Sequence, residues 1–387
     1  MANLLLPIIY LSFISLGLPD TLLGSAWPVM YQQFQVPVSY AGIVSFIMSA
    51  GTIFSSLMSD RLTRRFGTAK VTAFSVAMTA FALFGFSVSD RYWMLLLWAI
   101  PYGLGAGSVD ASINNYVALH YASRHMSWLH CMWGVGASVG PYIMGCALTA
   151  GQGWHMGYRY IAILQTLLTF VLLLSVPIWK KRNADASAEN EAAGAALSLK
   201  QIISIPGAKE ILLAFFCYCA LESTVTLWSA TYLVRHLGMH EEQAASLASL
   251  FLLGLTAGRA VSGFLTYKFN DANMIRIGQT VIFTGVTTML LPLGDVFDMA
   301  GLLLIGLGCA PVYPSVIHST PDHFGPENSQ ALIGVQMASA YIGSLSAPPI
   351  FGLIANHITV SVLPVYIGIL LTVMILMCER LNRKHNA

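Results

Sequence analysis

Three carboxylates lie near the centres of long apolar stretches of the chain: Asp20, Asp110 and Glu222. An acidic side chain in the middle of a bilayer costs about 3 kcal/mol or more, so such residues usually line a water-filled cavity. Burial at low dielectric favours the uncharged form of a carboxyl group, which can take up a proton on one side and release it on the other. The three acids therefore predict proton coupling. Asp110 is the expected carrier and Asp20 the expected acceptor for substrate hydroxyls, with Glu222 sharing either role.

Helical spacing gives each acid small neighbours and hydrogen-bonding or aromatic neighbours on the same face. Pro19 should also free a backbone carbonyl beside the first acid. A face turned to lipid would lack this composition, so we expect these faces to line a cavity. The alternative is a set of interhelical hydrogen bonds that hold a bundle together. The three faces are Phe13, Gly17, Asp20, Gly24 and Trp27; Gly103, Gly107, Asp110 and Asn114; and Tyr218, Glu222 and Ser229.

Sugars present hydroxyls at their edges and apolar C–H groups on their faces, so their sites combine polar side chains with aromatic surfaces. Most aromatic residues in such a chain pack helices or lie at the membrane interfaces, which is the alternative for each. The expected hydrogen-bonding residues are Asn114, Asn115, His130, Gln336 and Tyr313, and the expected stacking residues are Trp27, Trp133, Trp228 and Tyr341.

The composition requires that helices in a membrane position these residues. Of the 387 residues, 56% are hydrophobic and 9% are charged, whereas a soluble domain carries about 25% charged residues. The 19 basic and 17 acidic residues nearly balance, which argues against a nucleic-acid partner. The six cysteines lie in apolar runs without metal-ligand spacing and are expected to be small buried hydrophobes. No phosphate-binding glycine loop is present, so no nucleotide, metal or other cofactor is expected.

A helix that spans the bilayer needs about 20 apolar residues. The polar stretch 180–208 separates six such runs from another six, which predicts an N-terminal bundle (1–179), a cytoplasmic linker (180–208) and a C-terminal bundle (209–387). The expected fold is all-α with twelve transmembrane helices. The predicted spans are 4–31, 38–59, 69–88, 92–119, 126–149, 158–179, 210–235, 243–267, 273–292, 296–318, 328–356 and 360–379.

Basic residues accumulate in cytoplasmic loops. With both termini inside, only Arg91, Arg159 and Arg235 fall outside, and Arg259 lies within a helix. We expect Arg259 to snorkel, to pair with an acid or to cap helix ends near an inner gate. The expected location is the inner (plasma) membrane, as a monomer. The residues on the inner side are Arg61, Arg64, Arg65, Lys70, Arg124, Lys180, Lys181, Arg182, Lys200, Lys209, Lys268, Arg276, Arg380, Arg383 and Lys384.

The two halves repeat. The stretch 49–61 aligns without a gap onto 256–268, an offset of 207 residues that places the second span over the eighth. Parallel repeats of six helices are typical of transporters whose site lies between two rocking halves, although an inert duplicated bundle is the alternative.

The segment 56–65, Ser-Leu-Met-Ser-Asp-Arg-Leu-Thr-Arg-Arg, resembles the signature of the major facilitator superfamily. The resemblance implies a cytoplasmic loop between the second and third spans that latches the halves in the outward-facing state. The matching residues are Asp60, Arg61, Arg64 and Arg65, while Ser56 and Thr63 replace glycines.

A narrower resemblance is to the fucose permease and glucose/galactose transporter subfamily, carried mainly by 18–23 and 105–114. It implies that Asp20, Asp110 and Asn114 are functional and that the substrate is a neutral monosaccharide (a hexose, fucose-like) or a polyol, moved with a proton by alternating access. Supporting matches are Leu129-His130, Gly134 and Gly136, residues 310–314, Gln336-Met337 and Gly343.

Three other functions are alternatives to sugar–proton symport. One is a proton-coupled antiporter that exports lipophilic or cationic compounds, and another is a sodium-coupled or uncoupled sugar transporter. The third, an intramembrane aspartyl hydrolase, would need paired catalytic motifs that the sequence lacks, so no enzyme is expected.

Overall fold

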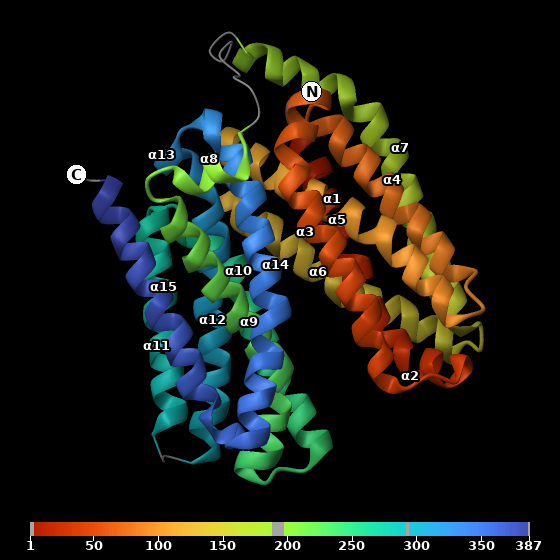
Figure 1. The fold of residues 1–387 in the computed structure, drawn as a ribbon, viewed down its shortest axis with the longest axis vertical. Helices are drawn as coiled ribbons and strands as arrows, with labels where there is room; N and C mark the ends of the chain where they lie inside the picture. The colour runs from red at the N-terminus through yellow and green to blue at the C-terminus, as the bar shows by residue number, and fades with distance from the viewer. Residues whose placement is uncertain (1–3, 188–196, 292–293, 386–387) are drawn as a thin grey trace. The chain divides into compact units, whose positions relative to one another are not determined.

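The computed structural model describes residues 4–187, 197–291 and 294–385, and this part of the chain consists of helices and short connections without a β-strand. Short 3-10 helices at Val38–Tyr40 and Val360–Val362 precede α3 and α15. The helices, in chain order and as labelled in Figure 1, are α1 (Leu5–Asp20), α2 (Leu22–Phe34), α3 (Ala41–Phe66), α4 (Thr68–Ser87), α5 (Tyr92–His120), α6 (Ser123–Thr149), α7 (Gly153–Ser187), α8 (Leu199–Ser204), α9 (Ala208–Leu237), α10 (Glu241–Leu265), α11 (Asp271–Leu290), α12 (Asp295–His318), α13 (Thr320–Phe324), α14 (Pro326–His357) and α15 (Leu363–His385).

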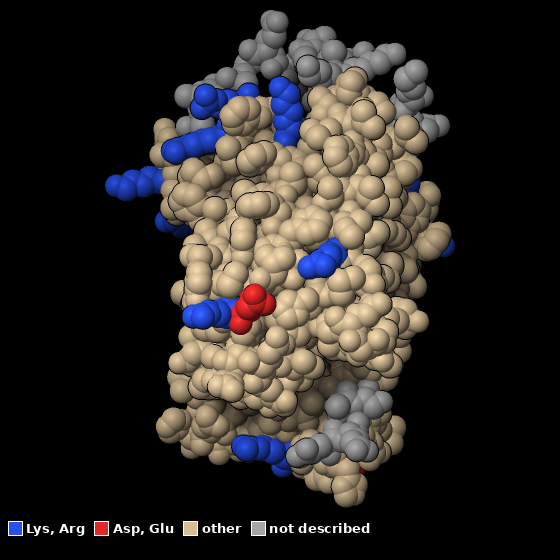
Figure 2. All heavy atoms as spheres, turned by 90° about the vertical axis from the view of Figure 1, so that its right-hand side faces the viewer, with Lys and Arg blue, Asp and Glu red and all other residues tan. Residues whose placement is uncertain are grey.

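Eleven helical stretches in the described residues are long and apolar enough to cross a membrane, with α1 and α2 together forming the first. The helix α11 occupies the remaining predicted span, where polar residues such as Arg276 and Gln279 lower its hydropathy. The predicted all-α fold with twelve membrane helices is therefore confirmed. Uncharged residues cover most of the face shown in Figure 2, as a surface in contact with lipid requires, and basic side chains gather toward its upper end.

Contacts group the chain into two compact units. The first comprises Met1–Tyr116, Leu129–Leu197 and Glu327–Ala338, and the second comprises Val117–Trp128, Ser198–Pro326 and Ser339–Ala387. Each unit therefore includes the first turns of a helix, α6 or α14, whose remainder belongs to the other unit. With the 207-residue offset of the repeat, 117–128 corresponds to 324–335, so the two exchanged segments are repeat equivalents. The division into bundles 1–179 and 209–387 stays a prediction, and part of its linker, 188–196, lies outside the described residues.

The segment expected as a loop between the second and third spans is helical instead. The helix α3 continues to Phe66 and carries Asp60 in its interior and Arg64 and Arg65 in its last turn. The first residue to break it is Gly67, whose φ of 80° favours glycine. Arginines at a helix C-terminus interact favourably with the helix dipole, which explains why this basic stretch continues the helix. The expectation of a loop here is wrong.

Pro19, one residue before α1 ends at Asp20, is the residue predicted to free a backbone carbonyl. Proline has no N–H, so the carbonyl of Ser15 loses its helical partner. That carbonyl accepts a hydrogen bond from Nε2 of Gln165 on α7 at 2.5 Å, and the Ser15 hydroxyl donates to Oε1 of the same side chain at 2.8 Å. The buried side chain of Gln165 thus supplies the hydrogen bond to Ser15 that Pro19 cannot donate.

This compensation predicts a double-mutant effect. We expect Gln165→Ala to destabilise the protein by about 1–3 kcal/mol, because it leaves a buried carbonyl without a donor. In a Pro19→Ala background the alanine N–H can satisfy Ser15, so the same substitution should cost less. Thermal denaturation of the four purified proteins in detergent measures both costs, and equal costs in the two backgrounds would contradict this account.

The cysteines follow their prediction in part. Cys217, Cys219, Cys309 and Cys378 are buried, whereas Cys131 on α6 is half-buried and Cys146 on the same helix is exposed. Its expected burial is wrong, because a helix face turned to lipid can also carry a small apolar residue.

Candidate functional site

Asp20 is the last residue of α1, and its side chain is exposed. Its carboxylate accepts two hydrogen bonds within the first unit. The Tyr102 hydroxyl on α5 donates to Oδ1 at 3.0 Å, and the Trp133 indole N–H on α6 donates to Oδ2 at 2.9 Å. The acid is therefore held in a fixed orientation by two aromatic donors while it stays accessible.

Glycines bring α6 close enough to α1 for Trp133 to reach this acid. A Cβ atom at Gly17 would collide with the carbonyl oxygen of Trp133, and one at Gly136 would collide with the carbonyl oxygen of Ile14. A Cβ at Gly140 would meet the next turn of α1 in the same way. These glycines thus allow close packing of the helix pair that carries the acid, and Gly17, expected on a face that lines a cavity, packs against α6 instead.

We expect Gly136→Ala to lower the stability of the protein by about 1–3 kcal/mol, since the methyl group has no space without a shift of α1. Gly145→Ala, on the same helix, is the matched control because nothing lies within 4 Å of its Cβ position. The apparent melting temperatures in detergent measure the difference. A Gly136→Ala protein as stable as the Gly145→Ala protein would show that this contact does not restrict the packing.

A second polar cluster lies deeper in the first unit. Asp110 on α5 is 8% exposed, and its Oδ1 accepts a hydrogen bond from Nδ2 of Asn114 at 2.8 Å. The amide oxygen of Asn114 lies 3.0 Å from Nε2 of His130 on α6. Because that oxygen can only accept, Nε2 of His130 carries the proton. Asp110, Asn114 and His130 form one connected chain, closed by the edge-on contact of Phe13 with the histidine ring.

In the second unit, Glu222 and Arg259 form an ion pair. The Arg259 guanidinium on α10 lies 3.6 Å from the Glu222 carboxylate on α9, and Arg259 is 4% exposed. Aromatic rings of Tyr218 and Tyr313 pack beside the pair, and the Tyr218 hydroxyl donates to the carbonyl of Cys309 at 3.0 Å. Of the three roles expected for Arg259, the structure contains the ion pair with an acid. A buried cation requires such a counterion.

Several predicted ligand residues are engaged elsewhere. Trp27 donates its indole N–H to the carbonyl of Val38 at 2.7 Å. Trp228 donates to the carbonyl of Pro348 at 3.0 Å. The Asn115 side chain accepts a hydrogen bond from Ser329 at 2.6 Å. The contacts of Trp27 and Trp228 are those of residues that pack helices, which is the alternative role given above for aromatic residues.

The other predicted residues on α12 and α14 differ in accessibility. Gln336 is completely buried, whereas Tyr341 and Tyr313 are half-buried. Tyr313 packs against Phe215 with ring centroids 4.7 Å apart. Tyr313 also contacts the ring of Tyr218 beside the charged pair of Glu222 and Arg259.

Four of the five residues predicted for the cytoplasmic gate lie at the end of α3, whereas the fifth, Arg259, lies on α10. Asp60 and Arg64 form an ion pair at 2.8 Å, and Nη2 of Arg64 donates to the backbone carbonyl of Glu327 on α14 at 3.0 Å. Arg65 lies over the ring of Phe66, and Arg61 is exposed. Within the first unit, Arg64 thus links the end of α3 to the start of α14.

Sequence reasoning missed Tyr102, Gln165 and Ser329 as partners of the predicted residues. Tyr102 precedes the glycine face of α5 by one residue, which is the nearest signal for its position. The other two contact residues more than a hundred positions away, so spacing along one helix could not reveal them. Among the described residues, no group of three or more His, Cys, Asp or Glu side chains could hold a metal ion.

Comparisons with known proteins agree with this fold. A family model described as Major Facilitator Superfamily matches residues 9–317 and 211–386. The 4-hydroxybenzoate transporter PcaK of Pseudomonas putida is 24% identical over 379 residues, which cover 87% of this chain and 83% of PcaK. The glucose/mannose transporter GlcP of Bacillus subtilis (strain 168) is 21% identical over 321 residues, which cover 79% of this chain and 77% of GlcP.

Among solved structures, the E. coli fucose:proton symporter FucP in an outward conformation superposes with a TM-score of 0.79. The match covers 97% of this chain and 98% of FucP at 14% sequence identity. At that identity the likeness establishes the fold, while the substrate depends on the side chains described above.

Proposed function

Because the chain belongs to the Major Facilitator Superfamily, as a multi-pass membrane transporter of small molecules and not an enzyme, we propose that it carries a neutral monosaccharide or related polyol together with a proton by alternating access. We also propose that both termini are cytoplasmic, that the membrane is the plasma membrane, and that the protein works as a monomer. The distribution of basic residues supports the orientation.

The observation that carries the proposal is the arrangement around Asp20. An ionised carboxylate offers about four lone-pair positions, and Tyr102 and Trp133 occupy two of them. The remaining positions can accept hydrogen bonds from substrate hydroxyls, because the side chain is exposed. The adjacent indole supplies an apolar surface for the C–H face of a sugar ring. A carboxylate and an aromatic ring in contact are the two elements that a neutral sugar requires.

The cluster around Asp110 supports proton coupling. The hydrogen bond that Asp110 accepts from Asn114 comes from a neutral amide, which stabilises a carboxylate less than a cation would. Glu222 differs, because the guanidinium of Arg259 lies 3.6 Å away and forms an ion pair with it. We therefore assign proton carriage to Asp110 and an electrostatic role to Glu222. Asn114 and His130 would relay the change in protonation between α5 and α6.

A second candidate function follows from Arg259. A substrate carboxylate could replace Glu222 as the counterion of this buried guanidinium, and PcaK is a 4-hydroxybenzoate transporter. In this case the cargo would be a small organic anion and Glu222 would take up the proton. The other acids argue against this substrate, because an exposed Asp20 repels an anion.

A thermal-shift screen of the purified protein at two pH values tests these candidates, since a ligand stabilises the state that binds it. The panel contains monosaccharides, polyols, 4-hydroxybenzoate and a cationic dye. We expect stabilisation by at least one monosaccharide or polyol. Stabilisation by 4-hydroxybenzoate alone would favour the anion, and stabilisation by the dye alone would favour an exporter of cations.

A further inference from the structure

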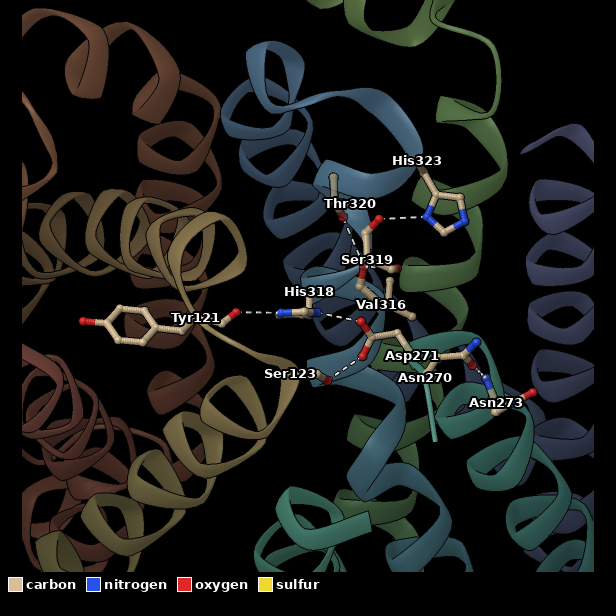
Figure 3. Close-up of polar contacts among 10 residues, drawn as sticks. All are labelled: Tyr121, Ser123, Asn270, Asp271, Asn273, Val316, His318, Ser319, Thr320 and His323. Atoms are coloured by element: carbon tan, nitrogen blue, oxygen red, sulfur yellow. Dashed lines mark hydrogen bonds and ion pairs between the residues drawn. The ribbon is translucent and has the colours of Figure 1, made fainter. Parts of the chain in front are cut away.

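His318, at the C-terminal end of α12, uses both nitrogens of its ring (Figure 3). Its Nδ1 lies 2.6 Å from Oδ2 of Asp271 at the start of α11, and its Nε2 lies 2.9 Å from the backbone oxygen of Tyr121. The other carboxylate oxygen of Asp271 accepts a hydrogen bond from Ser123. All four residues belong to the second unit, and the His318 and Asp271 side chains are largely buried.

The partners determine the protonation state of His318. A backbone carbonyl can only accept, so Nε2 must carry a proton to bond with Tyr121. An ionised carboxylate also only accepts, so Nδ1 must carry a proton to bond with Asp271. An imidazole with both nitrogens protonated has a positive charge. Both hydrogen bonds to an ionised Asp271 and to Tyr121 therefore exist together only when His318 is a cation.

The charged and titratable groups around His318 come from three elements. Asp271 on α11 contacts it directly, and Asp322 on α13 acts on it through its charge. Both carboxylates favour the cation. The remaining groups bond with other partners: His323 Nδ1 with the carbonyl of Ser319, the Arg124 guanidinium with the ring of Tyr267, and the His125 ring with the rings of Tyr121 and Trp128.

The contact fixes the connection between α5 and α6. The segment Val117–Trp128, which contains this connection with the last turn of α5 and the first turns of α6, is grouped with the second unit, although most of α5 and α6 belongs to the first. Arg64 makes the same type of bridge in the first unit, from the Asp60 carboxylate to the backbone carbonyl of Glu327. The guanidinium of Arg64 is always charged, whereas an imidazole loses its charge near pH 6.5, about the middle of the physiological range.

We infer that His318 and Asp271 form a proton-binding site, separate from the acids proposed for coupling, whose protonated form fastens the α5–α6 connection to α11 and α12. Deprotonation of His318 removes one of its two donors. Because the carboxylate of Asp271 retains the proton on Nδ1 through the stronger, charge-assisted bond, the hydrogen bond from Nε2 to Tyr121 is lost. The connection is thus held at low pH and released as the pH rises through the titration of His318.

Hydrogen–deuterium exchange of the full-length protein in detergent tests this inference without a substrate. After correction for intrinsic exchange, we expect the amides of 117–128 to exchange about tenfold more slowly at pH 5.5 than at pH 8.5, the effect of one hydrogen bond to a charged group. His318→Gln should exchange rapidly at both pH values, and His318→Arg should stay protected at both. His323→Gln is the matched control and should behave like the wild type.

Two results would overturn the inference. The first is equal protection of 117–128 at both pH values in the wild type, and the second is pH-dependent protection that survives in His318→Gln. If the arginine side chain disturbs the fold, Asp271→Asn gives an independent measurement. Its amide oxygen can still accept from Ser123, but the loss of charge should shift the release to lower pH, and an unshifted release would contradict the role of Asp271.

Discussion

Asp110→Asn is expected to abolish proton-driven accumulation of the substrate while exchange across the membrane continues. Asparagine can still accept from Asn114, so the local structure should persist, but it cannot take up and release a proton. One pH unit across the membrane corresponds to about 1.4 kcal/mol per proton, or about a tenfold concentration ratio. Uptake into proteoliposomes under a pH gradient of one unit should therefore fall from about tenfold accumulation to simple equilibration.

Asp298→Asn is the matched control for this substitution. Asp298 on α12 is also a buried acid, and its carboxylate accepts a hydrogen bond from Tyr232 at 2.7 Å. We expect this variant to keep its coupling, because the amide oxygen can replace the carboxylate oxygen as acceptor. Full accumulation by Asp110→Asn would remove Asp110 from the coupling role.

Asp20→Ala is expected to weaken substrate binding by about tenfold to a hundredfold, because it removes hydrogen bonds between hydroxyl groups and a charged acceptor, each worth about 1.5–3 kcal/mol. Calorimetry with the monosaccharide identified by thermal shift measures the dissociation constant. Tyr102→Phe is the matched control, since it removes one donor to Asp20 and leaves the carboxylate in place. It should cost about tenfold or less. Unchanged affinity in Asp20→Ala would count against the assignment.

The sequence predicts the fold well because a lipid bilayer permits only a few kinds of backbone structure to span it. A spanning segment must satisfy its own backbone hydrogen bonds, so long apolar runs can be read as helices. The same logic gives the effect of Pro19, since a missing N–H always frees one carbonyl. It fails at Asp60–Arg65, where a change to polar residues looks like a loop although α3 continues to Phe66. Polarity marks where lipid ends, and the helix itself continues beyond that point.

The partners of the predicted acids follow less readily from the sequence. The neighbours of Asp110 could be anticipated, since Asn114 lies one helical turn away and the resemblance supplies His130. The donors to Asp20 could not, because Tyr102 and Trp133 approach from other helices at distances set by glycine contacts. The pairing of Arg259 with Glu222 was one of three roles open to that arginine. Contacts between helices depend on their packing, which periodicity along one helix does not specify.

Substrate-driven proton movement tests the central claim most directly. The purified protein is reconstituted in liposomes that contain a pH-sensitive dye, and a gradient of the stabilising monosaccharide is applied without an initial pH gradient. The account predicts acidification of the lumen as the sugar enters the wild-type vesicles, and no acidification with Asp110→Asn. Sugar entry without acidification, or acidification driven by 4-hydroxybenzoate and by no sugar or polyol, would contradict it.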